Sequence, residues 1–401
     1  MDPSIFQPMA PGKLVPATGY DASVGSGTIR QPVEGWAFVP NPLPPILNSR
    51  EFHGDLVEPL LRAERALARL DTLSARLPNK DLLLSPFRLR EARLSSQIED
   101  TFATAEQIAM QDLEEAPPGS DTLEVWNYVR ALDHGLGSPL PLCNRLIREM
   151  HEILLRGVRG DEHRPGEFRT IQVCIGNREQ GFRAARFVPP PPGPILTECL
   201  NDLERFLNRS PDAGEPRFQP LIELAMSHYQ FECIHPFADG NGRLGRLLIA
   251  LALHRGSTTD RPVVYISAFL DKHRQRYYDL LLRVSTHGDW VSWVEFMLEA
   301  IATQTEDACH RANALEGLRE RYRAQAKHKR ASTTFLDAVD RLFMRPALNA
   351  SSLARALNKT PQAAQKYIND MVDLGMIREV TGGSYGRRYV ATEILRVADG
   401  E

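Results

Sequence analysis

Residues 235–246 bring together, within twelve positions, the residue types that chemistry on a phosphate group requires. The polar and glycine residues of this stretch are His235, Asp239, Gly240, Asn241, Gly242, Arg243, Gly245 and Arg246. An apolar run at 247–253 follows at once. This order predicts a loop that leads into the N-terminus of a buried helix.

Each residue type in the stretch suits one part of such chemistry. Unpaired backbone N–H groups at a helix N-terminus, flanked by glycines, attract phosphate, and arginines add charge and forked donors for the same anion. The carboxylate of Asp239 is suited to a hard cation such as Mg²⁺. His235 is suited to accepting a proton near neutral pH. The stretch therefore predicts a site for chemistry on a nucleoside phosphate.

The same stretch, read as HPFADGNGRLGR, resembles the signature HPFx(D/E)GNGRxxR of Fic-domain proteins, and it fills every defined position. A glycine turn before a core helix, with two solvated arginines, is the alternative explanation. The resemblance implies an enzyme that transfers AMP from ATP to a Ser, Thr or Tyr hydroxyl of a target protein. Such a transfer depends on alignment and charge stabilisation, with little covalent work for the protein.

The resemblance also implies a role for each residue of the loop. His235 would be the general base that deprotonates the incoming hydroxyl, and Asp239 would hold Mg²⁺ between the α- and β-phosphates. Arg243 would contact the β-phosphate and Arg246 the γ-phosphate. The nucleotide-binding residues of this loop would be Gly240, Asn241, Gly242, Arg243, Leu244, Gly245 and Arg246.

Residues 166–192 interrupt the helical trend of the chain and predict a short β-hairpin between helices. By resemblance this hairpin, which opens at 166–169, is a flap that lines the nucleotide site and holds the target backbone by strand addition. The residues nearest the nucleotide would be Val173, Cys174, Ile175 and Gly176. Tyr277 and Tyr278 stand on a later helix where the family has an aromatic wall for adenine, and core packing is an equally favoured interpretation.

An upstream segment at 95–100, SSQIED, resembles the inhibitory motif (S/T)xxxE(G/N). Ser95 and Glu99 are four residues apart and share one face of a helix. The resemblance implies that Glu99 reaches Arg246, takes the place of the γ-phosphate and leaves ATP in an unproductive pose. Asp100 stands where the motif has Gly or Asn, so we expect the helix to end differently, which leaves the strength of inhibition open.

The composition is that of an ordinary globular protein. The chain has 401 residues, a net charge of −3 and 25% charged residues, which predicts two or three domains and gives no global basic bias toward nucleic acid. The five cysteines are scattered without a CxxC pair, which favours reduced thiols over disulfides or a zinc site. Cys233 lies near His235 and is a conceivable nucleophile, but its apolar neighbours favour a buried structural thiol.

The N-terminus shows no signal-peptide pattern, and the longest apolar run is too short to span a bilayer. We therefore expect a cytoplasmic protein without a membrane partner. The expected fold is mostly α: a Fic-type helical bundle with a short β-hairpin flap and a C-terminal winged helix-turn-helix. The expected segments are an extended Pro/Gly-rich stretch at 1–48, an N-terminal helical region with the inhibitory helix at 49–120, the Fic catalytic core at 121–304, a linker helix at 305–330, and the winged helix-turn-helix at 331–401.

Within the core, periodicity predicts a helix capped by Asp121 or Thr122, and later helices at 143–155, 195–208, 219–233, 243–255, 270–286 and from 290. In the last segment, helices at 335–343 and 350–357 precede a third that Thr360-Pro361 opens. A hairpin formed by 376–380 and 388–390 completes the winged-helix pattern.

The expected third helix of this winged-helix pattern offers phosphate only one cation, Lys366. DNA binding is thus open but not favoured over protein contact or a homodimer, with Arg378, Arg387 and Arg388 as the best candidates for phosphate contact. We expect the segment to be separable and not needed for catalysis.

Other functions stay open at this point. A Fic enzyme can run in reverse and remove AMP, or transfer another phosphate group. The winged helix also fits a transcriptional regulator whose Fic core senses nucleotide. A metallohydrolase with His235 and Asp239 on one metal lacks an evident second His/Glu pair. The expected partners are ATP, Mg²⁺, an unidentified target protein on the flap, and the protein itself as a substrate for self-modification.

Overall fold

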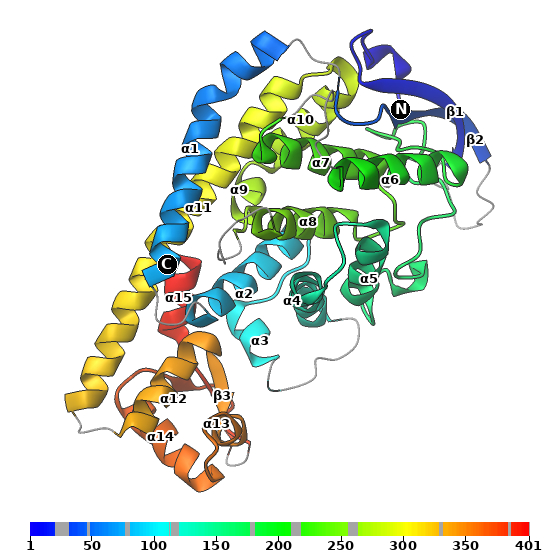
Figure 1. Ribbon diagram of the computed structural model, residues 1–401. Coiled ribbons are helices and arrows are strands. Elements are labelled where there is room, and N and C mark those ends of the chain that lie inside the picture. The colour runs from blue at the N-terminus through cyan, green and yellow to red at the C-terminus, as the bar shows by residue number, and fades with distance from the viewer. Residues whose placement is uncertain are drawn as a thin grey trace.

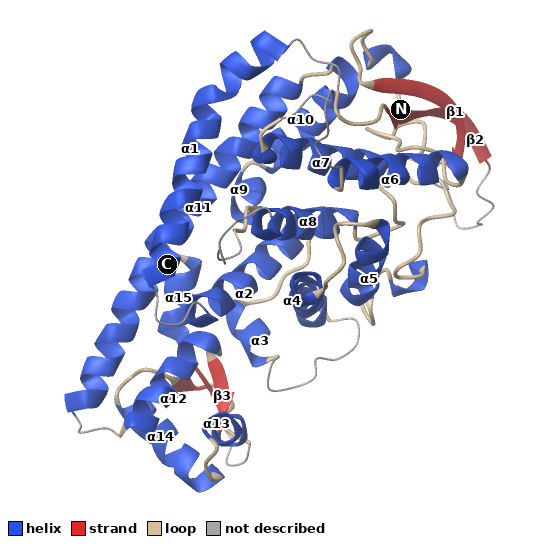
Figure 2. Ribbon diagram, in the orientation of Figure 1, coloured by secondary structure: helices blue, strands red, loops and turns tan. Residues whose placement is uncertain are grey.

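The computed structural model describes residues 1–20, 32–45, 49–76, 81–111, 113, 120–176, 181–209, 218–255, 264–328, 332–383 and 386–400. These residues form a mostly helical molecule with two small antiparallel sheets (Figure 2). The N-terminal elements are η1 Pro3–Ile5, β1 Gly12–Tyr20, β2 Pro32–Pro40, α1 Ser49–Arg76, α2 Asp81–Ile98 and α3 Ala105–Met110. The central elements are α4 Asp121–Gly137, α5 Asn144–Leu155, η2 Asp161–His163, α6 Pro194–Leu207, α7 Pro220–Ile234, α8 Asn241–Arg255, α9 Ser267–Lys272, α10 Arg274–His287 and α11 Trp290–His328. The C-terminal elements are α12 Thr333–Met344, β3 Ala347–Asn349, α13 Ala350–Leu357, α14 Pro361–Asp373, β4 Arg378–Glu379, β5 Arg388–Val390 and α15 Thr392–Asp399.

The site is carried by the central helices α7 and α8, which pack together and enclose the loop 235–240 between them. Most of α7 is buried, as expected for a helix at the centre of the molecule. The helices predicted at 219–233 and 243–255 are confirmed, although α8 begins two residues earlier, at Asn241. The cap of α4 is Ser120, whose hydroxyl accepts from the N–H of Leu123 at 3.2 Å, so the prediction of Asp121 or Thr122 as the cap was wrong.

The Pro/Gly-rich N-terminus is extended, as predicted, but it forms a paired hairpin that contributes to the core. Strands β1 and β2 are antiparallel, with Gly12 opposite Pro40 and Tyr20 opposite Pro32. Phe38 is fully buried and stacks on Phe6, and its N–H donates to Val188 O at 2.9 Å. The last four residues of β2 are all buried, so the strand lacks the alternation that would have revealed it in the sequence.

A single 39-residue helix, α11, replaces the two helices predicted from about 290 and at 305–330. It lies against α1, and the two long helices form one side of the molecule (Figure 1). The expected boundary between core and linker at 304/305 therefore falls inside a helix. No proline interrupts 290–328, and buried positions continue through its second half. The helix predicted at 270–286 is divided at His273 into α9 and α10.

The C-terminal segment shares a core with the second half of α11, from which Leu315 and Tyr322 pack with α12, α13 and α14, and it has a sheet with the strand order β3-β5-β4. Thr360 caps α14, as predicted, by accepting from the N–H of Ala363 at 3.3 Å. The predicted helices and hairpin strands are present, and β3 and α15 are additional. The assignment as a winged helix-turn-helix stays a prediction.

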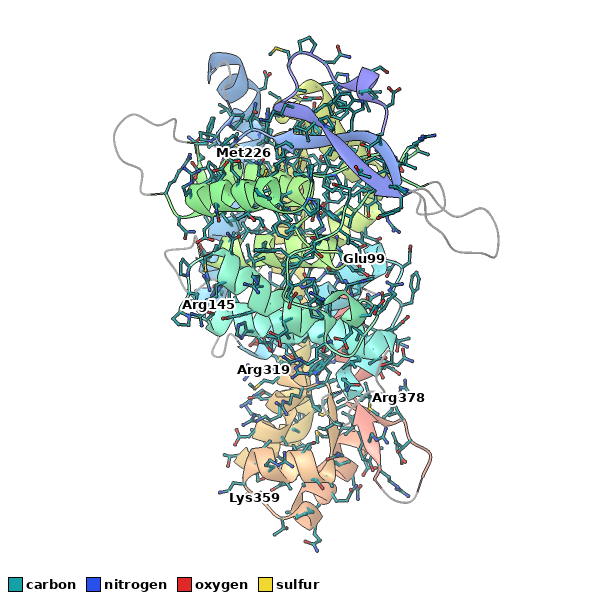
Figure 3. All side chains as sticks on the ribbon, turned by 90° about the vertical axis from the view of Figure 1, so that its right-hand side faces the viewer. Glu99, Arg145, Met226, Arg319, Lys359 and Arg378 are labelled. Atoms are coloured by element: carbon teal, nitrogen blue, oxygen red, sulfur yellow. The ribbon has the colours of Figure 1, made fainter. Side chains whose placement is uncertain are left out.

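This C-terminal segment contacts the helix that carries the inhibitory motif. Helices α12 and α15 both pack against α2 (Figure 1). Arg93 of α2 pairs with Asp399 at 2.9 Å, and Arg378 pairs with Glu106 of α3 at 2.5 Å. Figure 3 shows Arg378 near this junction and Lys359 toward the far end of the segment. That the segment is dispensable for catalysis stays a prediction.

Candidate nucleotide-binding site

The loop between α7 and α8 is held by its own backbone and by Asn241. His235 ends α7 in the left-handed region, with φ 50°, and its N–H donates to Phe231 O at 3.0 Å. The Asn241 amide donates to the carbonyl of Phe237 and accepts from its N–H, both at 2.9 Å. The side chain predicted to contact phosphate is therefore engaged in shaping the loop. The first N–H groups of α8 have no acceptor within the helix and remain suited to an anion.

His151 of α5 supports the loop, and the sequence analysis did not identify it. Its Nδ1 accepts from the N–H of Gly166 at 2.9 Å, which leaves Nε2 to donate to Asp239 O at 3.0 Å. Its ring also stacks on Phe237, with 3.7 Å between the centroids. Burial lowers the pKa of His151 to about 4, so the imidazole stays neutral and serves as a structural support.

Arg169 ties the predicted flap to the loop and was also missed as a functional residue. It is buried, and its Nε donates to His235 O at 2.8 Å while Nη2 donates to Pro190 O at 2.5 Å. Its backbone N–H donates to Pro236 O at 3.0 Å. The segment 166–169 marked the start of the flap in the sequence, but nothing local indicated that its arginine reaches the loop 235–240.

The surroundings of His235 determine its tautomer and its charge. Its Nδ1 lies 3.4 Å from Glu232 O, which assigns the ring proton to Nδ1 and leaves Nε2 as the acceptor. Burial, with the nearby charge of Arg169, lowers the pKa of His235 to about 4. The imidazole is therefore neutral at physiological pH, which is the form that can take a proton.

A cavity of ≈570 Å³ opens beside His235 and brings most of the predicted site together. The predicted residues that line it are Glu99, Val173, Cys174, Ile175, Gly176, His235, Asp239, Gly240, Asn241, Gly242, Arg246, Tyr277 and Tyr278. Its size and mixed polar and apolar walls suit a small-molecule ligand. Within the described residues, Ser95, Arg243, Leu244 and Gly245 lie outside the lining.

Sequence reasoning missed several residues that line the cavity. They include His163, Ile171, Arg186, Phe187, Tyr229, Glu232, Leu281, Leu282 and Ser285. Helical periodicity could have identified some of them. Tyr229 and Glu232 lie on the same face of α7 as His235, which directly follows that helix. In the same way, Leu281 and Ser285 continue the face of α10 that begins at Tyr277 and Tyr278.

The predicted flap is less regular than the hairpin expected at 166–192. Across its described part, one isolated bridge joins Ile175 and Phe187, with N–H to O distances of 2.8 and 3.1 Å. Four prolines at 189–192 remove backbone donors where the returning strand would pair. The Gly176-Asn177 pair also favours a turn between the two strands of this hairpin, but residues 177–180 lie outside the described part of the chain.

The contact predicted between Glu99 and Arg246 is confirmed. Nη2 of Arg246 donates to Glu99 Oε1 at 2.9 Å, while Nε donates to Ser95 Oγ at 2.8 Å. Burial alone would raise the pKa of Glu99, but Arg246 outweighs it and holds that pKa below its usual value. At neutral pH the carboxylate is therefore charged and occupies the guanidinium. Figure 3 shows Glu99 projecting within the upper body of the molecule, above the C-terminal segment.

Helix α2, which carries Ser95, ends at Ile98 and is followed by a left-handed residue at Asp100. Asp100 adopts the left-handed conformation, with φ 60°. The N–H groups of Asp100 and Thr101 donate to Gln97 O at 3.0 Å and Ser96 O at 3.1 Å. This helix end favours Gly or Asn, and Asp also tolerates it because its short side chain bonds locally.

Arg243 has a partner within the protein, and its role at the β-phosphate stays a prediction. Its guanidinium is buried and pairs with Glu124 of α4, outside the cavity lining. Glu124 also accepts from the Thr101 hydroxyl at 2.8 Å. In this structure Arg243 therefore ties α8 to α4 and to the end of the inhibitory helix.

The chemistry and surroundings of Asp239 fit a hard cation. Its Oδ1 accepts from the N–H of Gly240 at 2.7 Å, and its side chain lines the cavity beside the start of α8. Gly160 leaves room for it, since a Cβ there would lie 3.2 Å from Oδ2. The described residues hold no group of three His, Cys, Asp or Glu side chains placed for a metal.

Tyr277, Tyr278 and Cys233 all line the cavity, but their surroundings differ. Tyr277 is buried and its hydroxyl lies 2.8 Å from His228 Nε2, so it combines core packing with a place in the cavity wall. Tyr278 lines the cavity and is half-buried. Cys233 also reaches the cavity, but burial raises its pKa far above neutrality, which keeps the thiol protonated and unsuited to nucleophilic attack.

Among the described residues, no helix combines the length and apolar character needed to cross a membrane.

Comparisons with known proteins agree with this geometry. Residues 57–137 match the Fic/DOC family N-terminal model, and 141–253 match the Fic/DOC family model. Protein adenylyltransferase Fic from Aedes aegypti is 39% identical over 153 residues, which are 38% of this chain and 26% of that protein. The Culex quinquefasciatus protein of the same name is 36% identical over 153 residues, which again are 38% of this chain and 26% of that protein. The chain thus matches about a quarter of the length of these curated relatives.

Solved structures show the same fold at lower identity. A Fic family protein from Desulfovibrio desulfuricans G20 aligns with a TM-score of 0.54 and 22% identity, covering 88% of this chain and 98% of that one. Fic-1 from C. elegans aligns with a TM-score of 0.51 and 21% identity, over 67% and 76% of the two chains. The chain thus contains a Fic/DOC N-terminal domain at 57–137 and a Fic domain at 141–253.

Proposed function

We propose that the chain is a protein adenylyltransferase that transfers AMP from ATP to a hydroxyl of a protein. The observation that carries this proposal is one cavity in which a neutral His235, the N-terminus of α8 and the guanidinium of Arg246 meet. The name of the most similar curated relatives supports the same activity.

In this proposal His235 takes the proton of the incoming hydroxyl at Nε2. The hydroxyl oxygen then forms a bond to the α-phosphorus, and the bond from that phosphorus to the bridging oxygen breaks, so that diphosphate leaves. The first N–H groups of α8 hold the phosphates, and Arg246 pairs with the terminal one. Asp239 would hold Mg²⁺, which neutralises charge on the phosphates when bound.

Glu99 would then act as a brake on this activity. It already occupies Arg246 with a charged hydrogen bond at 2.9 Å, and Ser95 holds the same guanidinium from the preceding turn. A γ-phosphate and the Glu99 carboxylate compete for one cation. The inhibited state is therefore favoured until α2 shifts or Glu99 is replaced.

The target protein would reach His235 across the flap. Ile171, at the edge of the cavity, is 56% exposed, although it is a large apolar residue. An extended target segment that covers Ile171 and pairs with the irregular backbone at 172–174 would bring its hydroxyl to the cavity mouth. The protein itself is the simplest first substrate to examine, since self-modification needs no knowledge of the target.

The test compares Glu99→Gly with Glu99→Gly/His235→Ala, each incubated with labelled ATP and Mg²⁺, alone and with lysate. We expect Glu99→Gly to label itself about 10- to 100-fold more than the unchanged chain, because loss of the ion pair shifts the equilibrium by roughly 1.4–3 kcal/mol. We expect the second replacement to lower labelling by roughly 10²–10⁴-fold, the usual cost of losing a positioned base.

Two results would contradict the proposal. Equal labelling with and without His235 would remove the histidine from the mechanism. Loss of AMP removal from a labelled protein in Glu99→Gly, without any gain in labelling, would instead favour the reverse reaction, in which Glu99 positions a water.

A further inference from the structure

The cavity contains a second carboxyl group that the proposed reaction does not use. Glu232 lies on α7, one turn before His235, and its side chain lines the cavity. Its Oε1 is buried and has no hydrogen-bond partner among the described residues. An unpartnered carboxyl oxygen in such a place is costly to bury as an anion. Its position beside the phosphate-binding arginine suggests a role in nucleotide binding.

Gly245 provides the space for this carboxyl. A Cβ at position 245 would lie 2.2 Å from Glu232 Oε1, so any larger residue there would displace the side chain. Gly245 occupies a position that the signature leaves free, directly before Arg246. The glycine therefore seats Glu232 against the same turn of α8 that carries the cation.

Two carboxyl groups thus lie close enough to the guanidinium of Arg246 to feel its charge. Glu99 approaches from α2 and makes the hydrogen bond, while Glu232 approaches from α7 without a hydrogen bond to it among those the described residues form. The charge of Arg246 favours the anionic form of Glu232, and the charge of Glu99 opposes it. Burial is the largest influence and raises the pKa of Glu232 to about 7.

Two imidazoles and two phenols that face this part of the cavity stay neutral between pH 6 and 8. Burial lowers the pKa of His228 to about 3 and that of His235 to about 4, so both imidazoles stay neutral. Burial also raises the pKa values of Tyr277 and Tyr278. The remaining charged or titratable groups in the lining are Glu99 on α2, Arg246 on α8, Asp239 on the loop, His163 on η2, Cys174 and Arg186 on the flap, and Tyr229 and Cys233 on α7.

We propose that Glu232 sets the selectivity of the cavity for the charge of the nucleotide, so that a nucleoside triphosphate occupies Arg246 only when this carboxyl is protonated. This inference rests on the proposed function, in which Arg246 receives the terminal phosphate. An ionised Glu232 neutralises Arg246 and repels the incoming phosphate, whereas the neutral acid does neither. Binding then transfers one proton from solvent to the carboxylate of Glu232.

The expected signature is an ATP affinity that falls by up to tenfold for each pH unit above the pKa of Glu232. AMP, which has no phosphate at Arg246, should show little of this dependence. Removal of Glu99 lowers the pKa of Glu232, because the charge of Glu99 raises it. The decline should therefore begin at a lower pH in Glu99→Gly than in the unchanged chain.

The experiment measures binding of ATP with Mg²⁺ to full-length Glu99→Gly by calorimetry from pH 5.5 to 8, in buffers of different ionisation heat. We expect more net proton uptake in this protein than in Glu99→Gly/Glu232→Gln, whose affinity should stay high and nearly constant. Titration of the ATP phosphates is common to both proteins and cancels in the comparison. Glu223→Gln, on the same helix but paired with Arg209 outside the cavity, is the matched control. His163→Gln controls for the other imidazole in the wall.

The outcomes separate this inference from the proposed function. Equal proton uptake with and without Glu232, or no uptake in Glu99→Gly itself, would overturn the inference. The second measurement needs no replacement of Glu232 and so does not depend on the folding of that variant. Loss of ATP binding in Glu232→Gln would also overturn it, since the carboxylate would then be a ligand of the nucleotide. Failure of Glu99→Gly to bind ATP at any pH would instead contradict the proposed function.

Discussion

The two arginines of the signature lie three residues apart on α8, and each pairs with a carboxylate from the N-terminal half of the chain. Both guanidinium groups are buried. Their partners differ, since the side chain of Glu124 is 5% exposed and that of Glu99 is 35% exposed toward the cavity. Arg243 is thus enclosed within the protein, whereas Arg246 meets its carboxylate at the edge of a site.

This difference explains how one motif can contain both a structural arginine and an exchangeable one. A buried pair has lost water around both charges, so neither partner can leave without exposing the other to an apolar environment. A carboxylate at a cavity wall can instead be replaced by a phosphate of similar charge. The Arg243–Glu124 pair therefore stabilises the fold, and the Arg246–Glu99 pair is suited to regulation.

Among the variants that test this difference between the two ion pairs, Glu124→Ala should have the largest effect. We expect it to lower the free energy of unfolding by about 3–5 kcal/mol, because it leaves the Arg243 charge buried and unpaired. Denaturant unfolding monitored by circular dichroism measures this loss. Glu152→Ala removes an exposed pair with Arg156 and should change stability by less than about 0.5 kcal/mol. Similar losses in the two variants would show that Glu124 is not a buried anchor.

Much of this architecture follows from local sequence patterns. The loop 235–246 and the helices on either side were predicted because glycines and apolar runs determine backbone structure over only one or two turns of the chain. His151 and Arg169 were missed because their partners lie far along the chain, where no local pattern reports them. The pairing of Arg243 with Glu124 was missed for the same reason, since Glu124 lies 119 residues away. Glycine and proline content hid the β1–β2 hairpin, and prolines at 189–192 weakened the flap.

A second prediction separates the two arginines by ligand binding. We expect Arg246→Ala to weaken ATP binding by roughly 10- to 100-fold, the worth of charged hydrogen bonds of about 1.5–3 kcal/mol, and to weaken ADP binding much less. The Glu99→Gly background is required, so that the brake does not mask the effect. Calorimetric titration with each nucleotide measures the ratio.

Arg243→Lys is the matched variant for this measurement. It keeps the buried charge but loses the forked geometry, so it should lower thermal stability while leaving the ratio of ATP to ADP affinity unchanged. A larger change in the ratio of ATP to ADP affinity for Arg243→Lys than for Arg246→Ala would mean that Arg243, and not Arg246, contacts the terminal phosphate.

A third prediction concerns the link between the two pairs. The Thr101 hydroxyl donates to Glu124 at 2.8 Å, directly after the inhibitory helix. Thr101→Val keeps the shape and removes this bond, which should cost about 1 kcal/mol and raise self-labelling about fivefold if the bond holds Glu99 in place. The same replacement in Glu99→Gly should leave labelling unchanged. An equal rise in both backgrounds would place Thr101 outside the brake.

The smallest expected effect lies at Asp100, where the chain departs from the inhibitory motif. Its φ of 60° suits glycine better than any residue with a side chain, although Asp tolerates it. Asp100→Gly also removes an exposed contact with Arg274 at 3.4 Å, which contributes little. We expect the helix end to gain roughly 0.5 kcal/mol, which tightens the contact of Glu99 with Arg246 and lowers self-labelling about twofold. Asp100→Asn, which restores the other motif residue, should act in the same direction, because Asn also adopts this conformation readily. Increased labelling in both variants would mean that Asp100 strengthens the brake through its charge, and the exposed pair with Arg274 would then matter more than the backbone.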